Sequence, residues 1–502
     1  MKDKFFWADQ IADEIIKENK GKKEFVCASG ITPSGIVHIG NFREVITTDL
    51  VVRSLKDKGK KVRFIYSWDD FDRFRKVPSN IPKSMIKEYE NYIGMPVSEI
   101  PSPFVKGKSY AQYFEEVFEK EIKQVGIKPE FIRQNIMNKK HKYSELIKKA
   151  VDGRKEIIKI LNKYRKEDLK KDWMPFNVYC QKCKKDSTKI IGVEGYFIEY
   201  ECPPCREKDK IDYRKEGLVK LVWRVDWPAR WSYEGVEFEP GGIDHSADGG
   251  SFTTSKEVVK KIYDFKVPKY TFYEWVRIKG GTEFSSSTGN ALSLGEVSEI
   301  YEPEVLRYLF VGTRPNKGFA ISFDNDVIKI YDDFDDLERR YFDKKVNPQE
   351  KRIYELSVLK LGKKRKEKTS FRHLTTLVQI GKMEGLSKED KIRAKKVKNW
   401  LEKYAPDEMK FEFQEKIKIE LTDKEKLSLN LLKDSLKKKK LKTPDDLLNE
   451  FYNISQEAEI QTKEFFQTAY QVLIGKTRGP RLADLILFIG KEKIIKLLEL
   501  IK

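Results

Sequence analysis

The sequence predicts an α/β fold with a parallel sheet, which is interrupted by a cysteine-bearing insertion and followed by an all-α C-terminal domain. Three observations support this prediction. Residues 25–70 alternate strand-like and helix-like patterns, the order expected of a βαβ unit. Residues 180–205 hold four of the five cysteines, in two pairs. Residues 329–502 show helical periodicity almost throughout.

The predicted βαβ unit begins with a short buried strand over residues 25–31, which ends in a glycine turn. Residues 41–59 follow with apolar side chains at helical spacing, and Gly59 closes this helix. Residues 61–70 are rich in β-branched and aromatic side chains and are predicted to form a second strand. Two strands joined through a helix are parallel, and their crossover is right-handed.

A chain of 502 residues is too long for one hydrophobic core, so two to four domains are expected. We expect four consecutive parts: the first half of the sheet domain at residues 1–110, an insertion at 111–222, the second half of the sheet domain at 223–328, and the helical domain at 329–502. The insertion has a mostly helical pattern before its cysteines, and strand signals return after residue 226.

Composition narrows the class of protein. Lys and Arg number 100 against 80 Asp and Glu, a net charge of +20 that suits a polyanion such as nucleic acid. A lysine-rich surface without such a partner remains the alternative. No run reaches the roughly 18 apolar residues of a membrane helix, and the amphipathic start lacks the pattern of a signal peptide. A cytoplasmic protein without a membrane partner is expected.

The cysteines form two CxxC pairs, Cys180 with Cys183 and Cys202 with Cys205, separated by 18 residues. This spacing predicts a tetrahedral zinc site with four thiolate ligands, and such a site is structural because no position is open to water. Two disulfides or a redox pair are less favoured alternatives in a reducing compartment. Cys27 is left over, on the first strand, and is expected to be buried.

The loop after the first strand, GITPSGIVHIGN, has the character of a phosphate site. Gly35 and Gly40 allow the backbone to approach a ligand closely, and a helix is predicted to begin just after them. A helix N-terminus offers free N–H groups to phosphate. His38 can donate to a phosphate oxygen, and Asn41 can do so while capping the helix. An ordinary Pro/Gly turn with an incidental histidine is the alternative.

The stretch PSGIVHIGN resembles the HIGH motif of class I aminoacyl-tRNA synthetases, with Asn41 in place of the final histidine. Together with further stretches, it makes nearly the whole chain similar to class I lysyl-tRNA synthetases. These stretches are SGITPSG, SWDDFDRFRKVP at 67–78, WRVDWPARW at 223–231, FEPGGIDH at 238–245 and GPRLA at 479–483. The resemblance implies a Rossmann-like nucleotide-binding catalytic domain and a helical domain that binds the tRNA anticodon.

The resemblance also implies site residues. Those for ATP are Pro33, Gly35, His38, Gly40, Asn41, Asp244, Ser285, Ser286, Ser287 and Thr288. Those for lysine are Gly30, Thr32, Trp223, His245 and Tyr273. His38, Asn41, Ser285 and Ser287 are the expected catalytic residues. Glu274 is one candidate for the carboxylate that binds the lysine ε-ammonium.

One departure from the family concerns its KMSKS-type loop, which here reads EFSSSTGN. Glu283 and Thr288 stand where lysines are usual, so the remaining hydroxyl and backbone donors are neutral and bind phosphate less strongly than a cation. Lys279 is close enough in sequence to supply charge. Slower adenylate formation, or another lysine serving the site, is the hypothesis.

The implied reaction joins L-lysine to tRNA(Lys) with ATP and Mg2+, through a lysyl-adenylate that the terminal 2′-hydroxyl of the tRNA attacks. The lysine carboxylate is itself the nucleophile, so the enzyme contributes positioning and charge stabilisation. A monomer is expected. Two alternatives remain open: a class I synthetase for another amino acid such as glutamate, and a catalytically weak RNA-binding paralogue.

Overall fold

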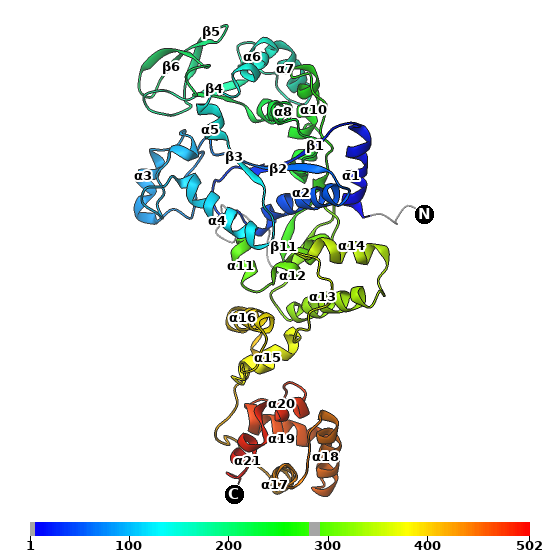
Figure 1. The fold of residues 1–502 in the computed structure, drawn as a ribbon. Coiled ribbons are helices and arrows are strands. Elements are labelled where there is room, and N and C mark those ends of the chain that lie inside the picture. The colour runs from blue at the N-terminus through cyan, green and yellow to red at the C-terminus, as the bar shows by residue number, and fades with distance from the viewer. Residues whose placement is uncertain (1–5, 281–291, 502) are drawn as a thin grey trace. The chain divides into compact units, whose positions relative to one another are not determined.

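The computed structural model describes residues 6–280 and 292–501 (Figure 1). The chain divides into two compact units. The first comprises Met1–Ser298, Pro303–Ile321 and Lys344–Leu361, and the second comprises Glu299–Glu302, Ser322–Asp343 and Gly362–Lys502. The four-part division expected from the sequence stays a prediction.

The first unit is built on a parallel sheet with the strand order β1-β2-β3. β1 (Glu24–Ile31) and β2 (Lys61–Trp68) are joined by α2 (Ile39–Asp57), which confirms the predicted βαβ unit. The middle of β1 is buried on both faces, as expected of a strand inside a parallel sheet. α2 packs on both strands, and α1 (Trp7–Glu18) packs on α2 (Figure 1).

The third strand, β3 (Glu130–Arg133), lies in a stretch whose pattern predicted helix. Its four residues are too few to display alternation, and helices flank them on both sides. On the other edge, Phe238 forms parallel bridges with Cys27 and with Lys269. The chain therefore returns to the first sheet after the insertion, as predicted, through single bridges rather than through a long strand.

The remaining elements of the first unit are mostly short. Besides α1, α2 and the two helices beside the cysteines, its helices are α3 (Ile86–Glu90), α4 (Tyr110–Gln124), α5 (Gln134–Lys139), α8 (Trp223–Glu234), α9 (Ile243–Ser246), α10 (Ser251–Lys261), α11 (Leu294–Ser298), α12 (Pro303–Val311) and α14 (Pro348–Ser357), with 3-10 turns η1 (Lys83–Met85) and η2 (Val97–Glu99). Two parallel pairs follow the insertion: β9 (Gly241–Gly242) with β10 (Phe272–Tyr273), and β11 (Val276–Ile278) with β12 (Phe319–Ile321).

The insertion carries α6 (Ser144–Asp152), α7 (Arg154–Asn162) and a cysteine module. We use that name for residues 176–221. Its stem is the antiparallel pair β4 (Phe176–Val178) and β8 (Val219–Leu221). Its outer part is the antiparallel sheet of β5 (Lys189–Glu194), β6 (Phe197–Cys202) and β7 (Glu207–Asp212). Short strands thus surround both cysteine pairs.

The second unit is helical, which confirms the predicted all-α C-terminal region. Its helices are α13 (Asp326–Phe342), α15 (Phe371–Gln379), α16 (Lys388–Lys403), α17 (Asp423–Lys438), α18 (Pro444–Glu457), α19 (Thr462–Ile474), α20 (Leu482–Ile489) and α21 (Lys491–Leu498), with the 3-10 turn η3 (Asp407–Met409). Arg393 on α16 is fully buried and pairs with Glu302 at 2.9 Å and Asp335 at 2.6 Å. In the described ranges, no helix combines the length and apolar character that a membrane crossing requires.

Candidate active site and metal centre

The start of α2 carries the HIGN residues. His38 occupies the N-cap in extended backbone (φ −80°, ψ 165°), and Asn41 lies inside the first turn. The expectation that Asn41 caps the helix is therefore wrong, because the helix begins at Ile39. Burial lowers the pKa of His38 to about 4, so its imidazole is neutral near pH 7 and carries one N–H donor.

The chain on the C-terminal side of residues 281–291 is bonded to this same helix start. Ile39 donates its backbone N–H to the carbonyl oxygen of Leu292 at 2.8 Å, and His38 forms an antiparallel bridge with Ser293. Ser285, Ser286, Ser287 and Thr288, with Glu283, lie outside the described residues, so their predicted roles stay predictions. The Lys279 side chain is exposed, and its backbone N–H bonds to Ile321.

Two of the predicted lysine-binding residues meet at a carboxylate that sequence reasoning missed. The backbone N–H of Gly30 donates to Glu44 Oε1 at 2.8 Å, and the Tyr273 hydroxyl donates to Glu44 Oε2 at 2.7 Å. Burial raises the pKa of Glu44 to about 8, even though both hydrogen bonds favour its ionised form. A buried carboxylate with a raised pKa in a group of site residues is a candidate for binding a cation.

Glu274 lies elsewhere. It follows Tyr273 at the end of β10, and successive strand residues point to opposite faces. Its charge acts on Arg43, whose pKa burial lowers to about 10 while Glu274 opposes that shift. Arg43 itself donates to the carbonyl oxygens of Arg314, Pro315 and Lys317. Glu44, rather than Glu274, is therefore the carboxylate that the structure brings to the predicted lysine residues.

Thr32, Trp223 and His245 are held by a second group of contacts. The Thr32 hydroxyl donates to Asp72 Oδ2 at 2.8 Å. The Trp223 and His245 rings lie 6.2 Å apart, between centroids. His245 is part of α9 with the exposed Asp244, and burial lowers the pKa of His245 while Asp244 opposes that shift.

A buried chain of alternating charges underlies these residues and joins the SWDDFD and WRVDWPARW stretches. Arg230 Nη1 lies 2.6 Å from Asp69, and Arg230 Nε lies 3.3 Å from Asp226. Lys220 Nζ lies 2.7 Å from Asp226 and 3.4 Å from Asp72. Each charge has an opposite partner, which offsets the cost of burying it. The Arg230 guanidinium also lies 5.2 Å from the Trp223 ring centroid.

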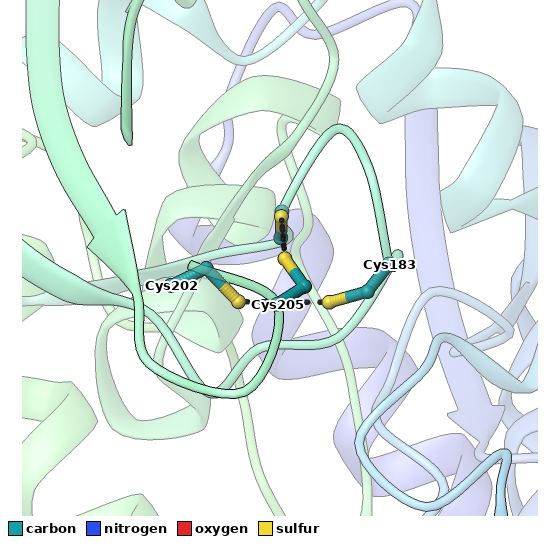
Figure 2. A group of neighbouring side chains, drawn as sticks. Cys183, Cys202 and Cys205 are labelled. Atoms are coloured by element: carbon teal, nitrogen blue, oxygen red, sulfur yellow. Dashed lines mark hydrogen bonds between the residues drawn. The ribbon is translucent and has the colours of Figure 1, made fainter. Parts of the chain in front are cut away.

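The four cysteines of the two CxxC pairs form one cluster, and Figure 2 shows Cys183, Cys202 and Cys205 within it. The Sγ atoms of Cys180 and Cys205 lie 3.5 Å apart, as do those of Cys183 and Cys202, and all four sulfurs lie within 4.8 Å of one another. Thiolates bonded to one tetrahedral ion at about 2.3 Å are separated by about 3.8 Å. The cluster could therefore hold a metal ion.

The two cysteine turns share one geometry. Lys184 follows the first pair with φ 62° and donates its N–H to the Cys180 carbonyl at 2.9 Å. Arg206 follows the second pair with φ 61° and donates to the Cys202 carbonyl at 2.7 Å. Such left-handed residues are uncommon outside glycine, so two at equivalent positions indicate that each turn is shaped to aim both sulfurs at one point.

The family model described as "tRNA synthetases class I (K)" matches residues 5–360. The chain belongs to the class I lysyl-tRNA synthetase family. Three relatives, each named lysine–tRNA ligase, cover 98% of this chain: that of Borreliella burgdorferi is 42% identical over 98% of its own length, that of Treponema pallidum 40% over 98%, and that of Pyrococcus horikoshii 38% over 99%.

The GPRLA stretch of this class I synthetase lines a cavity of about 670 Å³ in the second unit. Its lining includes Arg372, His373, Arg478, Arg481 and Phe488. The His373 and Phe488 rings meet edge-on, with 4.4 Å between centroids. Gly479 packs closely there, because a Cβ would lie 2.6 Å from Ile474 Cδ1 and 3.0 Å from Tyr470 Cδ1, so a larger residue would displace these side chains. Sequence reasoning noted the stretch, but only the fold shows that it borders a cationic cavity.

Proposed function

We propose that this chain is a lysine–tRNA ligase, which activates L-lysine with ATP and transfers it to tRNA(Lys). The family and its relatives support this activity. The observation that carries the choice of amino acid is the buried Glu44, bonded to Gly30 and Tyr273. When Glu44 is ionised, it attracts the ε-ammonium of lysine and repels the side-chain carboxylate of a glutamate substrate, which supports lysine over that alternative.

In this proposal Glu44 binds the ε-ammonium of lysine, with Tyr273 fixing the carboxylate. Trp223 and His245 enclose the aliphatic stem, because aromatic walls suit a cation-bearing chain. Thr32, oriented by Asp72, lies on the α-ammonium side together with Gly30. The lysine carboxylate, already ionised at pH 7, is then the group that attacks.

The nucleotide is proposed to lie at the start of α2. Neutral His38 donates to a phosphate oxygen, and Gly40 in the first turn presents its backbone N–H. Asn41, whose backbone N–H bonds to the His38 carbonyl oxygen at 2.9 Å, contributes its side-chain amide. Pro33 and Gly35 shape the preceding loop, and Asp244 binds the ribose hydroxyls. Mg2+ bound with ATP would neutralise phosphate charge. Ser285, Ser286, Ser287 and Thr288 remain predicted phosphate ligands.

The cysteine module is proposed to bind Zn2+ through Cys180, Cys183, Cys202 and Cys205. Four sulfur donors at tetrahedral separations suit this ion. With all four positions filled by protein, the ion is structural and takes no part in the reaction.

For tRNA we propose that the cavity beside GPRLA holds an unpaired nucleotide of the anticodon loop. Phe488 offers a ring face, and Arg478 and Arg481 offer charge for phosphate. The net charge of +20 supports a polyanionic partner. The monomeric state and the cytoplasmic location stay predictions.

A panel of amino acids in ATP–pyrophosphate exchange tests the function, followed by charging of tRNA(Lys). Exchange with lysine and charging of tRNA(Lys) are expected. Exchange with another amino acid would favour a different specificity. Tight tRNA binding without any exchange would favour the RNA-binding paralogue.

A further inference from the structure

We propose that the cysteine module holds the lysine-binding loop in place, with Tyr179 and Asp186 as positioning residues, so that metal occupancy controls lysine affinity. The lysine-binding loop is defined here as residues 69–76, which follow β2. This inference rests on the proposed function for its ligand, but its structural coupling can be measured without it.

The loop reaches the lysine site through Asp72. The Asp72 carboxylate accepts the Thr32 hydroxyl at 2.8 Å, and Thr32 directly follows the end of β1. β2 supports only the start of the loop. The rest of the loop continues toward residues 94–97, where Arg73 forms a bridge with Pro96. Val97 donates its N–H to the Asp72 carbonyl at 2.9 Å, and Ser98 donates to the Asp70 carbonyl at 2.9 Å. The loop conformation therefore depends on residues 94–98 and on what packs against both segments from outside the parallel sheet.

The first contact from the cysteine module is Tyr179, which immediately precedes Cys180. Its hydroxyl donates to the carbonyl oxygen of Phe71 at 2.8 Å, and the two rings meet edge-on at 4.9 Å. Both side chains are buried. A buried hydrogen bond to a loop carbonyl fixes that loop, because the carbonyl has no water to turn to if the donor moves.

The second contact is Asp186, three residues after Cys183. Its backbone N–H donates to the Gly94 carbonyl at 2.9 Å, and its carboxylate lies 3.4 Å from Arg73 Nε. The Asp186 side chain is only 5% exposed. The first CxxC turn is thus flanked on both sides by residues that contact the loop or its continuation.

A third contact acts on Asp72 itself. Lys220 on β8 lies 3.4 Å from Asp72, and β8 pairs with β4, the strand that leads into Tyr179 and Cys180. Asn177 and Lys220 are register partners in that pair. Displacement of the first cysteine turn would therefore reach Asp72 by two routes, through Phe71 and through Lys220.

A metal ion bound by the four cysteines would fix the position of the first cysteine turn. The cysteine turns are short and join small strands, so a metal ion bound by all four thiolates would add to the backbone hydrogen bonds that shape each turn. Without the ion, the turn between Tyr179 and Asp186 would be more mobile. Asp72 would then orient Thr32 less well. Lysine binding then weakens while the parallel sheet, which does not depend on the module, keeps the ATP site.

The test uses the metal-loaded full chain with Tyr179→Phe and Asp186→Asn. Tyr196→Phe is the matched control, because Tyr196 belongs to the same module but donates to Glu145 on α6. Metal content, the KM values for lysine and ATP in pyrophosphate exchange, and hydrogen exchange of residues 69–76 are measured for each protein.

Both test variants are expected to retain one metal ion per chain and to raise the lysine KM about fivefold, the size of one lost hydrogen bond, with the ATP KM unchanged. Amides of residues 69–76 are expected to exchange faster. Tyr196→Phe is expected to match the wild type. A lysine KM at the wild-type value with metal retained, or equal increases in both KM values, would overturn the proposal.

Metal removal with a chelator provides the second arm. Lysine affinity, measured by calorimetry, is expected to fall at least as far as in the variants, and amides of residues 69–76 are expected to exchange faster. Added Zn2+ is expected to reverse both changes. Unchanged exchange in the metal-free chain would overturn the coupling. The exchange readout holds even if the panel selects another amino acid, so failure of the proposed function is distinguished from failure of the coupling.

Discussion

At the scale of single residues, the proposed preference for lysine is assigned to Glu44. In the sequence it is an ordinary glutamate in a predicted helix, and nothing in its spacing sets it apart from a solvated residue. Only the fold distinguishes it, because β1 and β10 bring Gly30 and Tyr273 to its two carboxylate oxygens. A contact between three distant segments has no signature in any one of them.

The raised pKa of Glu44 predicts that lysine affinity depends on pH. Below about pH 8 the free carboxyl is mostly protonated, whereas binding a cation requires the ionised form. Affinity for lysine is therefore expected to rise as pH increases toward 8, by up to about tenfold per pH unit, and to level off above it. Calorimetric titration from pH 6 to 8.5 measures this dependence.

Glu44→Gln provides the control for this dependence. The variant is expected to bind lysine at least about thirtyfold more weakly, since a buried charge partner is lost, and with a flat pH profile. A pH profile in the variant that matches the wild type would assign the titration to another group.

Gly30 offers a second test at this scale. A Cβ there would lie 2.6 Å from the Ser67 carbonyl oxygen, so Gly30→Ala must push β1 away from β2 at the lysine site. The lysine KM is expected to rise more than about tenfold, because a displacement of about 1 Å at a binding site is costly. Gly192→Ala on β5, where nothing lies within 4 Å, is the matched control and is expected to leave the KM unchanged.

At the scale of elements, we expect the stability of the second unit to depend strongly on the buried guanidinium of Arg393. Arg393 on α16 ties Glu302 to Asp335 on α13, and its removal leaves two carboxylates without their partner. Arg393→Ala is expected to destabilise this unit by about 3 kcal/mol or more. Hydrogen exchange of α13 and α16 in increasing urea measures the change. Lys398→Ala on the exposed face of α16 is expected to have little effect, and equal effects of the two variants would contradict the argument.

Elements with a strong local pattern were predictable. β1, α2 and β2 carry apolar periodicity of the right length, and the doubled CxxC spacing specifies its own ligands. β3 was not predictable because its four residues show no period and owe their strand form to pairing with β2. The start of α2 was misplaced because His38, rather than the better capping residue Asn41, occupies the N-cap. The phosphate roles of Ser285–Thr288 are still a sequence prediction.

At the scale of the whole molecule, the charge distribution predicts that salt affects tRNA binding more than lysine binding. The net charge of +20 acts over long distances on a polyanion, whereas Glu44, the proposed lysine ligand, is buried and therefore less screened by salt. Raising salt from 50 to 200 mM is expected to increase the KM for tRNA at least about tenfold. Lysine-dependent pyrophosphate exchange is expected to change less than about twofold. Equal losses in charging and exchange would place the salt effect in the pocket.

The single bridges made by Phe238 determine when the parallel sheet can gain its last neighbour during folding. The edge of β1 next to Cys27 gains its neighbour only from a residue far along the chain, after the insertion. During synthesis from the N-terminus, β1, β2 and β3 can assemble early, yet one margin of that nascent sheet stays open until residue 238 emerges. An unpaired strand edge can pair with other chains, so we expect the nascent protein to be most prone to aggregation before residue 238 has been synthesised.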